Sequence, residues 1–376
     1  MGLKEPENRA PAFVLGLGVT GLATLRALYK AGVEVSGFGS EKAEPGRFSR
    51  RAKTFPAPAP ERDGAALRTY LLEAAPRRCR PVLIPTSDAH LLFMSRHRAA
   101  LETAYLFILP VEEVVEAMVD KRRQVSLALR HGIACPRTLF ADDPCALLAM
   151  AEDMAFPAFL KPAHSHLWRP VFHNKGLRLE TRAELKPALE QADRHDLAVT
   201  LQEIVPGPAT NHYEVCVCMG QDGEPLAVFT TRKLRQWPVD FGIGTLLESV
   251  RQPELERRAV NFLKAIGFKG TAAIEFKKNA ENGVFLMIEV NGRLWSDHTL
   301  ALACGLNYPL LAYLDLLGAP PPAVRAAHRR GDHSGKNTAA AVRCAAAACA
   351  GGTSKNFSAA VAGPIKFWIS RITLHC

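Results

Sequence analysis

Two glutamates on a pair of otherwise apolar strands constrain this chain more than any other feature of its sequence. Glu275 and Glu289 lie in two consecutive strand-like segments, TAAIEFKKN and VFLMIEVNG, whose connecting loop centres on Asn282. In a hairpin, the two carboxylates would be cross-strand neighbours on one face, roughly 5 Å apart. Asn291, two residues beyond Glu289, points to that same face. The pattern therefore predicts a polar site on a hairpin.

The neighbours of these carboxylates favour a metal site over a solvent-exposed hairpin. Both faces of the second strand are apolar, through Val284, Phe285, Leu286, Met287, Ile288 and Val290. A carboxylate in such surroundings is costly, and two that face each other repel. A divalent cation removes both penalties, and two carboxylates with an amide oxygen are ligands that Mg²⁺ prefers.

The order Glu-Phe, then Ile-Glu-Val-Asn-Gly-Arg, resembles the metal hairpin of the ATP-grasp superfamily. The similarity is to the branch with biotin carboxylase, carbamoyl phosphate synthetase and the D-aspartate-ligase-like carboxylate–amine ligases. It implies that Glu275, Glu289 and Asn291 hold two Mg²⁺ ions on the phosphates of ATP. It also implies that Arg293 contacts the acyl phosphate or its precursor.

Further segments occur in the order that this resemblance requires. Lys121 follows Asp120 at a helix start, and Lys161 ends a strand in Leu-Lys-Pro, as the two ATP-binding lysines of the family do. The segment from Gln202 to Gly207 is similar to the family's hinge, where backbone groups of Glu203 and Val205 would recognise the adenine edge. The other nucleotide contacts that the resemblance implies are Ser165, His166, Lys175, Gln202 and Glu214.

Two loops indicate which branch of the superfamily the chain resembles and which residues line its expected substrate pocket. The segment AHSHLWRPVFHNKG after Lys161 has one glycine, unlike the glycine-rich lid of biotin carboxylase, and looks more like the D-aspartate-ligase type. The polar segment TTRKLRQWPVDFGIG precedes Glu248, and in the ligase branch this region lines the acceptor pocket. The residues of this segment that are expected to bind an anionic substrate are Arg232, Lys233 and Arg235. A basic loop exposed to solvent explains these three residues equally well.

Together, these residues predict an ADP-forming ligase that joins a carboxylate to an amine through an acyl phosphate. Arg293, Lys161 and Arg232 are the expected catalytic residues, with ATP and two Mg²⁺ ions as cofactors. Two alternatives stay open. One is a bicarbonate-activating carboxylase or carbamoyl-phosphate-type enzyme, and the other is a catalytically inactive nucleotide-binding module.

Four segments are expected along the chain. The expected fold class is α/β and α+β, with a Rossmann-like domain that precedes an ATP-grasp fold in the sequence. Residues 1–110 form that first domain, with strands at Pro81–Pro85 and Leu106–Leu109. Residues 111–200 hold a helix from Val111 to Arg130 and the lid, and residues 201–318 hold the metal site. Residues 319–376 are a basic, low-complexity tail, expected to be disordered, or else a shifted reading frame.

A second glycine motif points to a different function. Gly16-Leu17-Gly18-Val19-Thr20-Gly21 has the form of a dinucleotide-binding fingerprint between a strand and a helix. The second strand, however, ends without an acid at its tip to bind a ribose. We therefore expect these glycines to serve a tight turn or the second substrate.

Charge and cysteine usage exclude several partners. The tail carries +7 of the net charge of +10, so the body is close to neutral and no nucleic-acid partner is expected. Nine cysteines include no Cys-x-x-Cys pair, which argues against a zinc site or a disulfide framework. Without a signal peptide or membrane-spanning segment, the chain is expected to be cytoplasmic. Its expected partners are small carboxylates and amines, and a homo-oligomer is compatible with the sequence.

Overall fold

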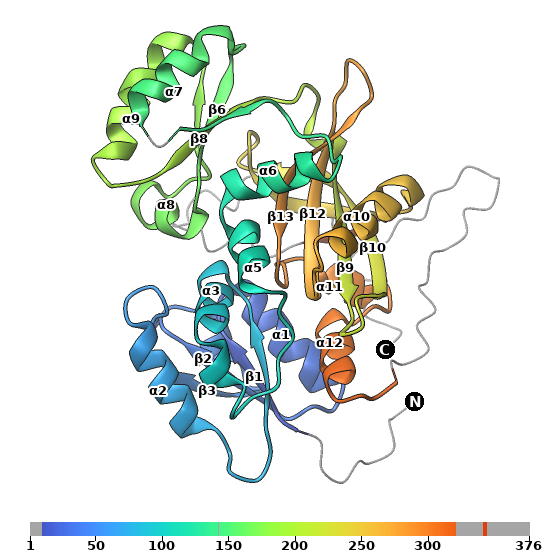
Figure 1. The fold of residues 1–376 in the computed structure, drawn as a ribbon. Helices are drawn as coiled ribbons and strands as arrows, with labels where there is room; N and C mark the ends of the chain where they lie inside the picture. The colour runs from blue at the N-terminus through green and yellow to red at the C-terminus, as the bar shows by residue number, and fades with distance from the viewer. Residues whose placement is uncertain (1–9, 142, 321–340, 344–376) are drawn as a thin grey trace, which may run out of the picture.

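Three sheets, each with its own helices, make up the computed structural model, which describes residues 10–141, 143–320 and 341–343 (Figure 1). The first sheet is parallel, with strand order β3-β2-β1-β4. Its elements are β1 (Ala12–Leu15), α1 (Val19–Lys30), β2 (Val35–Gly39), β3 (Lys53–Pro56), α2 (Gly64–Ala74), β4 (Val82–Pro85), α3 (Asp88–Arg96) and α4 (Arg98–Leu101).

Two strand assignments in this part differ from expectation. Leu106 makes only an isolated bridge to Val82, so the strand predicted at Leu106–Leu109 is wrong. Strand β3, which was not expected, is mostly exposed at the sheet edge and lacks the apolar run that marks a buried strand.

The helix predicted from Val111 to Arg130 is wrong as a single element. The chain forms α5 (Glu112–Val119) and α6 (Lys121–Arg130) instead. The break lies at Asp120, whose carboxylate accepts the Arg122 N–H at 2.8 Å and caps α6. An N-cap residue has extended backbone angles, so it ends the preceding helix. Lys121 therefore opens a new helix, as the resemblance implied.

The second sheet is small and antiparallel, in the order β5-β8-β6-β7. Its helices α7 and α9 lie at the top of Figure 1, and α8 lies below them towards α3. The segment after Lys161, expected as a lid loop, contains α8. The elements are β5 (Thr138–Leu139), α7 (Pro144–Met150), β6 (Ala158–Pro162), α8 (Ser165–Phe172), β7 (Leu177–Leu179), α9 (Leu185–Asp193) and β8 (Val199–Glu203).

The third sheet is antiparallel, in the order β13-β12-β9-β10-β11-β14. Helix α10 covers one face, and α11 and α12 cover the other. Strand β11 is not predicted by the sequence, and its first two residues, Ile243 and Gly244, lie in the polar segment expected at 230–244. The elements are β9 (His212–Met219), β10 (Pro225–Trp237), β11 (Ile243–Val250), α10 (Pro253–Ala265), β12 (Gly270–Lys278), β13 (Phe285–Asn291), α11 (His298–Ala303), α12 (Tyr308–Leu316) and β14 (Ala341–Arg343).

Four short 3₁₀ helices complete the described elements: η1 (Pro45–Phe48), η2 (Ala151–Asp153), η3 (Arg182–Glu184) and η4 (Ala209–Asn211). None of the helices in the described ranges is long and apolar enough to cross a membrane. Of the predicted tail, residues 319–320 and 341–343 are described, and the rest lies outside the described residues. The predicted domain boundaries stay a prediction.

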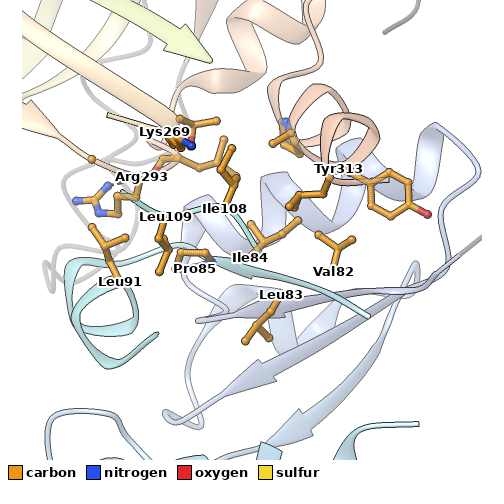
Figure 2. Close-up of a pocket in the computed structure, with 16 residues that line it drawn as sticks. Val82, Leu83, Ile84, Pro85, Leu91, Ile108, Leu109, Lys269, Arg293 and Tyr313 are labelled. Atoms are coloured by element: carbon orange, nitrogen blue, oxygen red, sulfur yellow. Dashed lines mark hydrogen bonds between the residues drawn. The ribbon is translucent and has the colours of Figure 1, made fainter. Parts of the chain in front are cut away.

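The first sheet packs directly against the third. One hydrophobic core combines Leu25 and Leu28 of α1, Cys216 of β9, and Tyr308 and Tyr313 of α12. A cavity of about 40 Å³ lies in this junction, lined by β4, α12 and the segment Gly292–Leu294 (Figure 2). A space of this size admits only a few water molecules. It is therefore a packing gap rather than a substrate pocket, and it places β4 immediately beside Arg293.

Candidate functional site

Three carboxylates form a row across neighbouring strands of the third sheet. The register places Glu275 of β12 opposite Glu289 of β13, which confirms the predicted cross-strand pair. Glu214 of β9 lies opposite Glu275 on its other side. Like charges in directly opposite positions destabilise a sheet unless something compensates them. We call Glu214, Glu275 and Glu289 the carboxylate row.

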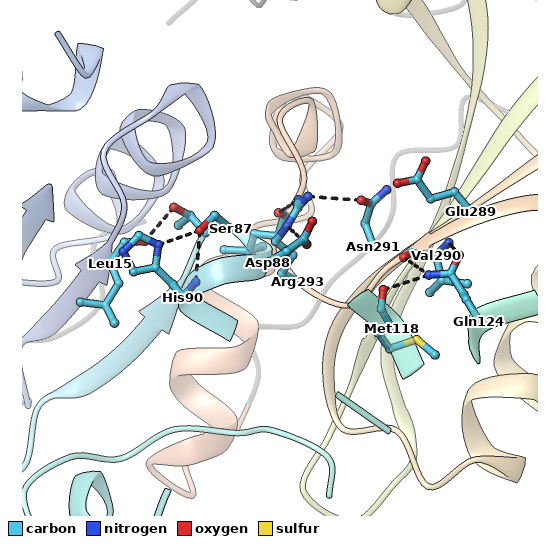
Figure 3. Close-up of polar contacts among 12 residues, drawn as sticks. Leu15, Ser87, Asp88, His90, Met118, Gln124, Glu289, Val290, Asn291 and Arg293 are labelled. Atoms are coloured by element: carbon cyan, nitrogen blue, oxygen red, sulfur yellow. Dashed lines mark hydrogen bonds and ion pairs between the residues drawn. The ribbon is translucent and has the colours of Figure 1, made fainter. Parts of the chain in front are cut away.

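A buried glutamine fixes the strand that carries Glu289 and Asn291. The Gln124 amide donates to the Val290 carbonyl at 2.7 Å and accepts the Val290 N–H at 2.8 Å (Figure 3). It donates as well to the Met118 carbonyl, at 2.9 Å. Gln124 is only 2 % exposed, so these bonds are not exchanged for bonds to water. Sequence reasoning missed this residue, although an amide on an otherwise apolar helix face was a usable signal.

Lys121 lies directly on the carboxylate row. Its Nζ is 2.8 Å from Glu289 Oε1, and both side chains are largely buried. Although burial opposes it, the Lys121 ammonium lowers the pKa of Glu289 well below its usual range. The Lys121 N–H donates to the Ala163 carbonyl at 3.1 Å, which ties the start of α6 to the residue after β6. The first predicted lysine therefore contacts the hairpin that carries Glu289.

Lys161 and Lys175 approach the same row from the second sheet. Burial, together with the neighbouring Lys121 ammonium, lowers the pKa of Lys161 to about 8, while Glu289 and Glu275 partly oppose that shift. Burial also lowers the pKa of Lys175, which lies within electrostatic range of Glu275 and Glu289. The structure thus brings three predicted lysines together over the carboxylates, where a polyanionic ligand would be attracted.

The residues around Glu289 fit a magnesium site in the chemistry of their donors. Two facing carboxylates and the Asn291 amide supply hard oxygen ligands, and Mg²⁺ typically takes one or two carboxylates together with phosphate oxygens. No group of three or more His, Cys, Asp or Glu side chains in the described part of the chain is arranged to hold a metal ion. A cation here would therefore need Asn291 and oxygens from a ligand.

A fourth carboxyl group, missed at the sequence level, extends the row. Asp297 hydrogen-bonds the Glu214 side chain. Burial raises the pKa of Asp297 to about 6, and burial and then Asp297 raise the pKa of Glu214. Asp297 follows Arg293 by four residues, beyond the end of β13, so strand alternation alone could not place it.

Arg293 is held between the third sheet and the first. Its Nε donates to Asp88 Oδ1 at 2.7 Å, and its Nη2 donates to Asn291 Oδ1 at 3.3 Å (Figure 3). Asp88 begins α3, directly after the N-cap Ser87. Sequence reasoning missed Asp88, because 205 residues separate it from Arg293.

The predicted hinge lies on β8 and the turn that follows it. Gln202 is buried and donates to Thr138 Oγ1 at 2.9 Å, and the Glu203 N–H donates to the Arg137 carbonyl at 2.9 Å. Val205 is buried, and within the described residues its backbone makes no hydrogen bond to another backbone group. The hinge therefore keeps free backbone groups at Val205, whereas the N–H of Glu203 is already used.

The remaining lid candidates lie at the start of α8. Ser165 is the first residue of this helix, and His166 follows it. His166 lies within electrostatic range of Asp88 and Arg96 of α3. The lid helix thus faces the carboxyl end of the first sheet.

Arg232 is not brought together with the other candidates. Residues 227, 229, 231 and 233 of β10 face the carboxylate row or the core beneath it, so Arg232 points to the opposite face, which α10 covers. There its Nε donates to Glu248 at 2.6 Å. Lys233 lies on the carboxylate side, within electrostatic range of Glu214 and Asp297. Arg232 therefore lies on the face away from the carboxylate row, and Arg235 is exposed.

The glycine motif of the first sheet is a tight turn. A Cβ at Gly21 would lie 2.0 Å from the Gly16 carbonyl oxygen, so only glycine fits there. The Leu17 N–H donates to Glu44 Oε1 at 3.0 Å. A carboxylate therefore already lies at the turn that would receive a dinucleotide pyrophosphate, and the two anions would repel.

Comparisons with known proteins agree with this geometry. Residues 235–313, which include β12 and β13, match the family model described as "Carbamoyl-phosphate synthase L chain, ATP binding domain". The chain is 26% identical over 208 residues to a D-alanine–D-alanine ligase of Pseudomonas entomophila, covering 51% of this chain and 62% of that protein. It is 22% identical over 288 residues to a D-aspartate ligase of Enterococcus faecium, covering 72% and 68%.

Among solved structures, the fold is similar to the biotin carboxylase of Campylobacter jejuni. The TM-score is 0.65 at 19% sequence identity, over 84% of this chain and 72% of that one. At this identity the likeness establishes the fold alone. The match to the D-alanine–D-alanine ligase spans about three fifths of that protein's length.

Proposed function

We propose that the chain is an ATP-grasp enzyme, an ATP-dependent carboxylate–amine ligase, because it is similar to ligases of that kind and part of it matches the family model. In this reaction ATP phosphorylates a carboxylate, and an amine then displaces phosphate from the acyl phosphate to give an amide, ADP and phosphate. The observation that carries the proposal is the carboxylate row beside Asn291, faced by Lys121, Lys161 and Lys175.

The three lysines provide the electrostatic part of the proposed chemistry. Phosphoryl transfer spreads negative charge over the transferred group, and fixed cations at that place stabilise it. With a pKa of about 8, Lys161 is largely protonated at neutral pH and keeps its charge when ATP arrives. Ser165 at the start of α8 would add a hydroxyl donor to the phosphates.

Glu275, Glu289 and Asn291 are the residues that would hold Mg²⁺, and we propose two ions. When bound, Mg²⁺ would neutralise charge on the phosphate oxygens and orient them. The protein's part is to keep both carboxylates facing each other. The β12–β13 pairing and the Gln124 bonds to Val290 serve this purpose.

The base of ATP would lie at the hinge. The backbone groups of Val205 are proposed to read the adenine edge, with the carbonyl of Glu203 beside them and Gln202 supporting the strand. Glu214 is proposed to lie near the nucleotide. Arg293 is proposed to contact the carboxyl group of the acid, and its Nη2 donation to Asn291 supports this role.

Similarity to two amide-forming ligases supports this reaction over carboxylation. The lid supports it too, since the segment after Lys161 forms α8 rather than a glycine-rich loop. A bicarbonate-activating enzyme is the second candidate, favoured by the carbamoyl-phosphate synthase model and the biotin carboxylase fold. The two differ in whether bicarbonate alone drives ATP cleavage.

The test is ADP release by the purified protein across panels of acids and amines. We expect release that needs one acid and one amine together, and we expect Glu289→Ala to reduce it at least about 100-fold. Glu254→Ala is the matched control, since Glu254 is an exposed α10 residue paired with Arg258. Turnover that survives Glu289→Ala would exclude the proposed metal ligands.

Two other outcomes discriminate the alternatives. ATP cleavage that depends on bicarbonate and needs no amine would replace ligation with carboxylation. Calorimetric binding of ATP without turnover on any acid or amine would identify a nucleotide-binding module.

A further inference from the structure

The first sheet directs a charged residue at the proposed ligase site. Strand β1 pairs with β2 on one side and β4 on the other, so the chain changes direction between β1 and β4. In open parallel sheets, ligands bind at the carboxyl ends of the strands at such a switch point. Asp88 lies at this place, one turn of chain after β4 and at the start of α3.

Asp88 completes a set of bonds that fixes the Arg293 guanidinium. Arg293 donates from Nε to Asp88 at 2.7 Å, from Nη1 to the Leu294 carbonyl at 3.0 Å, and from Nη2 to Asn291 at 3.3 Å. A guanidinium has five N–H donors, so one donor on each terminal nitrogen is left for a ligand. A planar group held at all three nitrogens presents those two donors in one orientation.

The charges around Arg293 show what Asp88 opposes. The guanidinium is attracted by Asp88 from one side and by Glu289 and Glu214 of the carboxylate row from the other. Without Asp88, the remaining anions would draw the guanidinium towards the proposed metal ligands. The Asp88–Arg293 pair is also well enclosed, with side chains 20% and 18% exposed. Water therefore screens it less than a surface pair.

We propose that Asp88 is a positioning residue for the ligase reaction, holding Arg293 in line for the acyl group and away from the carboxylate row. The inference rests on the proposed function. It implies that the first sheet contributes a residue, Asp88, to the proposed site. Asp88 acts through Arg293 and touches no reacting atom.

The experiment compares Asp88→Asn, Asp88→Glu and a matched control, Glu112→Gln. Glu112 is an exposed acid in the first turn of α5, so its change removes the same kind of helix-terminal charge. A charge-assisted hydrogen bond contributes about 1.5–3 kcal/mol, which corresponds to about 10–100-fold. We expect Asp88→Asn to lower kcat/KM for the carboxylate by that factor, with KM for ATP changed less than about twofold.

Asp88→Glu should recover most of the loss, since it keeps the carboxylate, and Glu112→Gln should match the wild type. Equal losses towards ATP and the carboxylate, or a loss in Glu112→Gln as large as in Asp88→Asn, would make the role merely structural and overturn the proposal. So would Asp88→Asn with full activity.

A second readout does not depend on turnover. In protein labelled with ¹⁵N at the arginine Nε, the Arg293 Nε–H signal is assigned by its loss in Arg293→Lys. Its exchange with water should be slow in the wild type and Asp88→Glu and at least about tenfold faster in Asp88→Asn. Unchanged exchange overturns the positioning of Arg293 whatever the activity. A wild type that turns over no acid and amine sinks the proposed function instead, and the signal still decides whether Asp88 holds Arg293.

Discussion

The carboxylate of Glu289 is already paired with a positively charged side chain, that of Lys121. The Lys121 ammonium lies 2.8 Å from a carboxylate oxygen that we propose as a metal ligand. A metal ion must therefore compete with an ammonium that is already in place. Phosphates of a bound nucleotide would draw Lys121 away, so metal and nucleotide should bind cooperatively.

This competition predicts a gain of metal affinity from the loss of Lys121. Lys121→Gln should bind Mn²⁺ in the absence of nucleotide about 5–10-fold more tightly than the wild type, from an ion pair of about 1 kcal/mol. Its affinity for ATP should fall. Mn²⁺ titration followed by electron paramagnetic resonance measures this, with the exposed Lys186→Gln of α9 as control. Unchanged or weaker Mn²⁺ binding would contradict the prediction.

Asp297 predicts a pH-dependent gain of stability. Burial raises its pKa from 3.8 to about 6, so the folded protein binds this proton more tightly than the unfolded chain does. Ionised Asp297 therefore lowers the free energy of unfolding. This loss is absent below about pH 4, grows up to about pH 6 and is complete above it. Asp297→Asn should therefore be more stable than the wild type at pH 7.5, by on the order of 1 kcal/mol. Urea unfolding at pH 7.5 and at pH 4 measures the difference, which should vanish at the lower pH.

Single residues divide into those that strand alternation could place and those it could not. Glu275, Glu289 and Asn291 share one hairpin, so counting from the loop located them. Gln124 and Asp88 meet β13 and Arg293 across 166 and 205 residues, and no local pattern encodes such contacts. The face on which Arg232 lies could not be predicted from a segment expected as a loop, because the residues around it form the paired strands β10 and β11.

Among the elements, β13 depends on α6 through one side chain. Gln124→Leu leaves the N–H and carbonyl of Val290 without partners in a buried place. Each unsatisfied group costs about 1–3 kcal/mol, so we expect the two groups together to lower the unfolding free energy by about 2–6 kcal/mol. Urea denaturation measures it, and Gln191→Leu on the exposed side of α9 is the control. A loss below about 0.5 kcal/mol for Gln124→Leu would show that β13 does not need this support.

Elements with strong patterns were predictable, and those set by neighbours were not. The strands β12 and β13 carry apolar runs and follow their predicted segments, and β6 contains Lys161 near its end, as predicted. Strand β3 is an exposed edge strand, and β11 carries a mixed pattern that pairing with β10 stabilises. The break between α5 and α6 was predictable from Asp120, because an aspartate directly before a helix start favours an N-cap there.

At the scale of the whole molecule, the second sheet is linked to the third through the tip of the β10–β11 hairpin. Phe241 of the tip stacks on Phe159 of β6, with ring centroids 4.0 Å apart. Lys175 and Lys233 approach the Gly242 carbonyl from the two sheets, at 3.4 and 3.5 Å. The lid therefore rests on a point close to the proposed phosphate site.

Removing this contact should loosen the lid without unfolding the rest. An aromatic pair contributes about 0.5–1.5 kcal/mol, so Phe241→Ala should speed hydrogen exchange of residues 158–179 by up to about tenfold. Exchange in β12 should not change. Val239→Ala is the control, because Val239 lies on the same tip but is 72% exposed. Equal exchange rates of residues 158–179 in the two variants would show that the Phe241 contact does not stabilise the lid.

Each member of the carboxylate row lies at the same level of a different strand, so the row runs across the chain direction. Its assembly depends on register and is independent of how long the connections are. Extra residues at the turns near Gly223 or Asn282 leave the row intact, whereas one residue inserted within β12 before Glu275 turns that carboxylate to the α10 face. Insertions and deletions in such proteins should therefore accumulate in the turns and be excluded from these three strands.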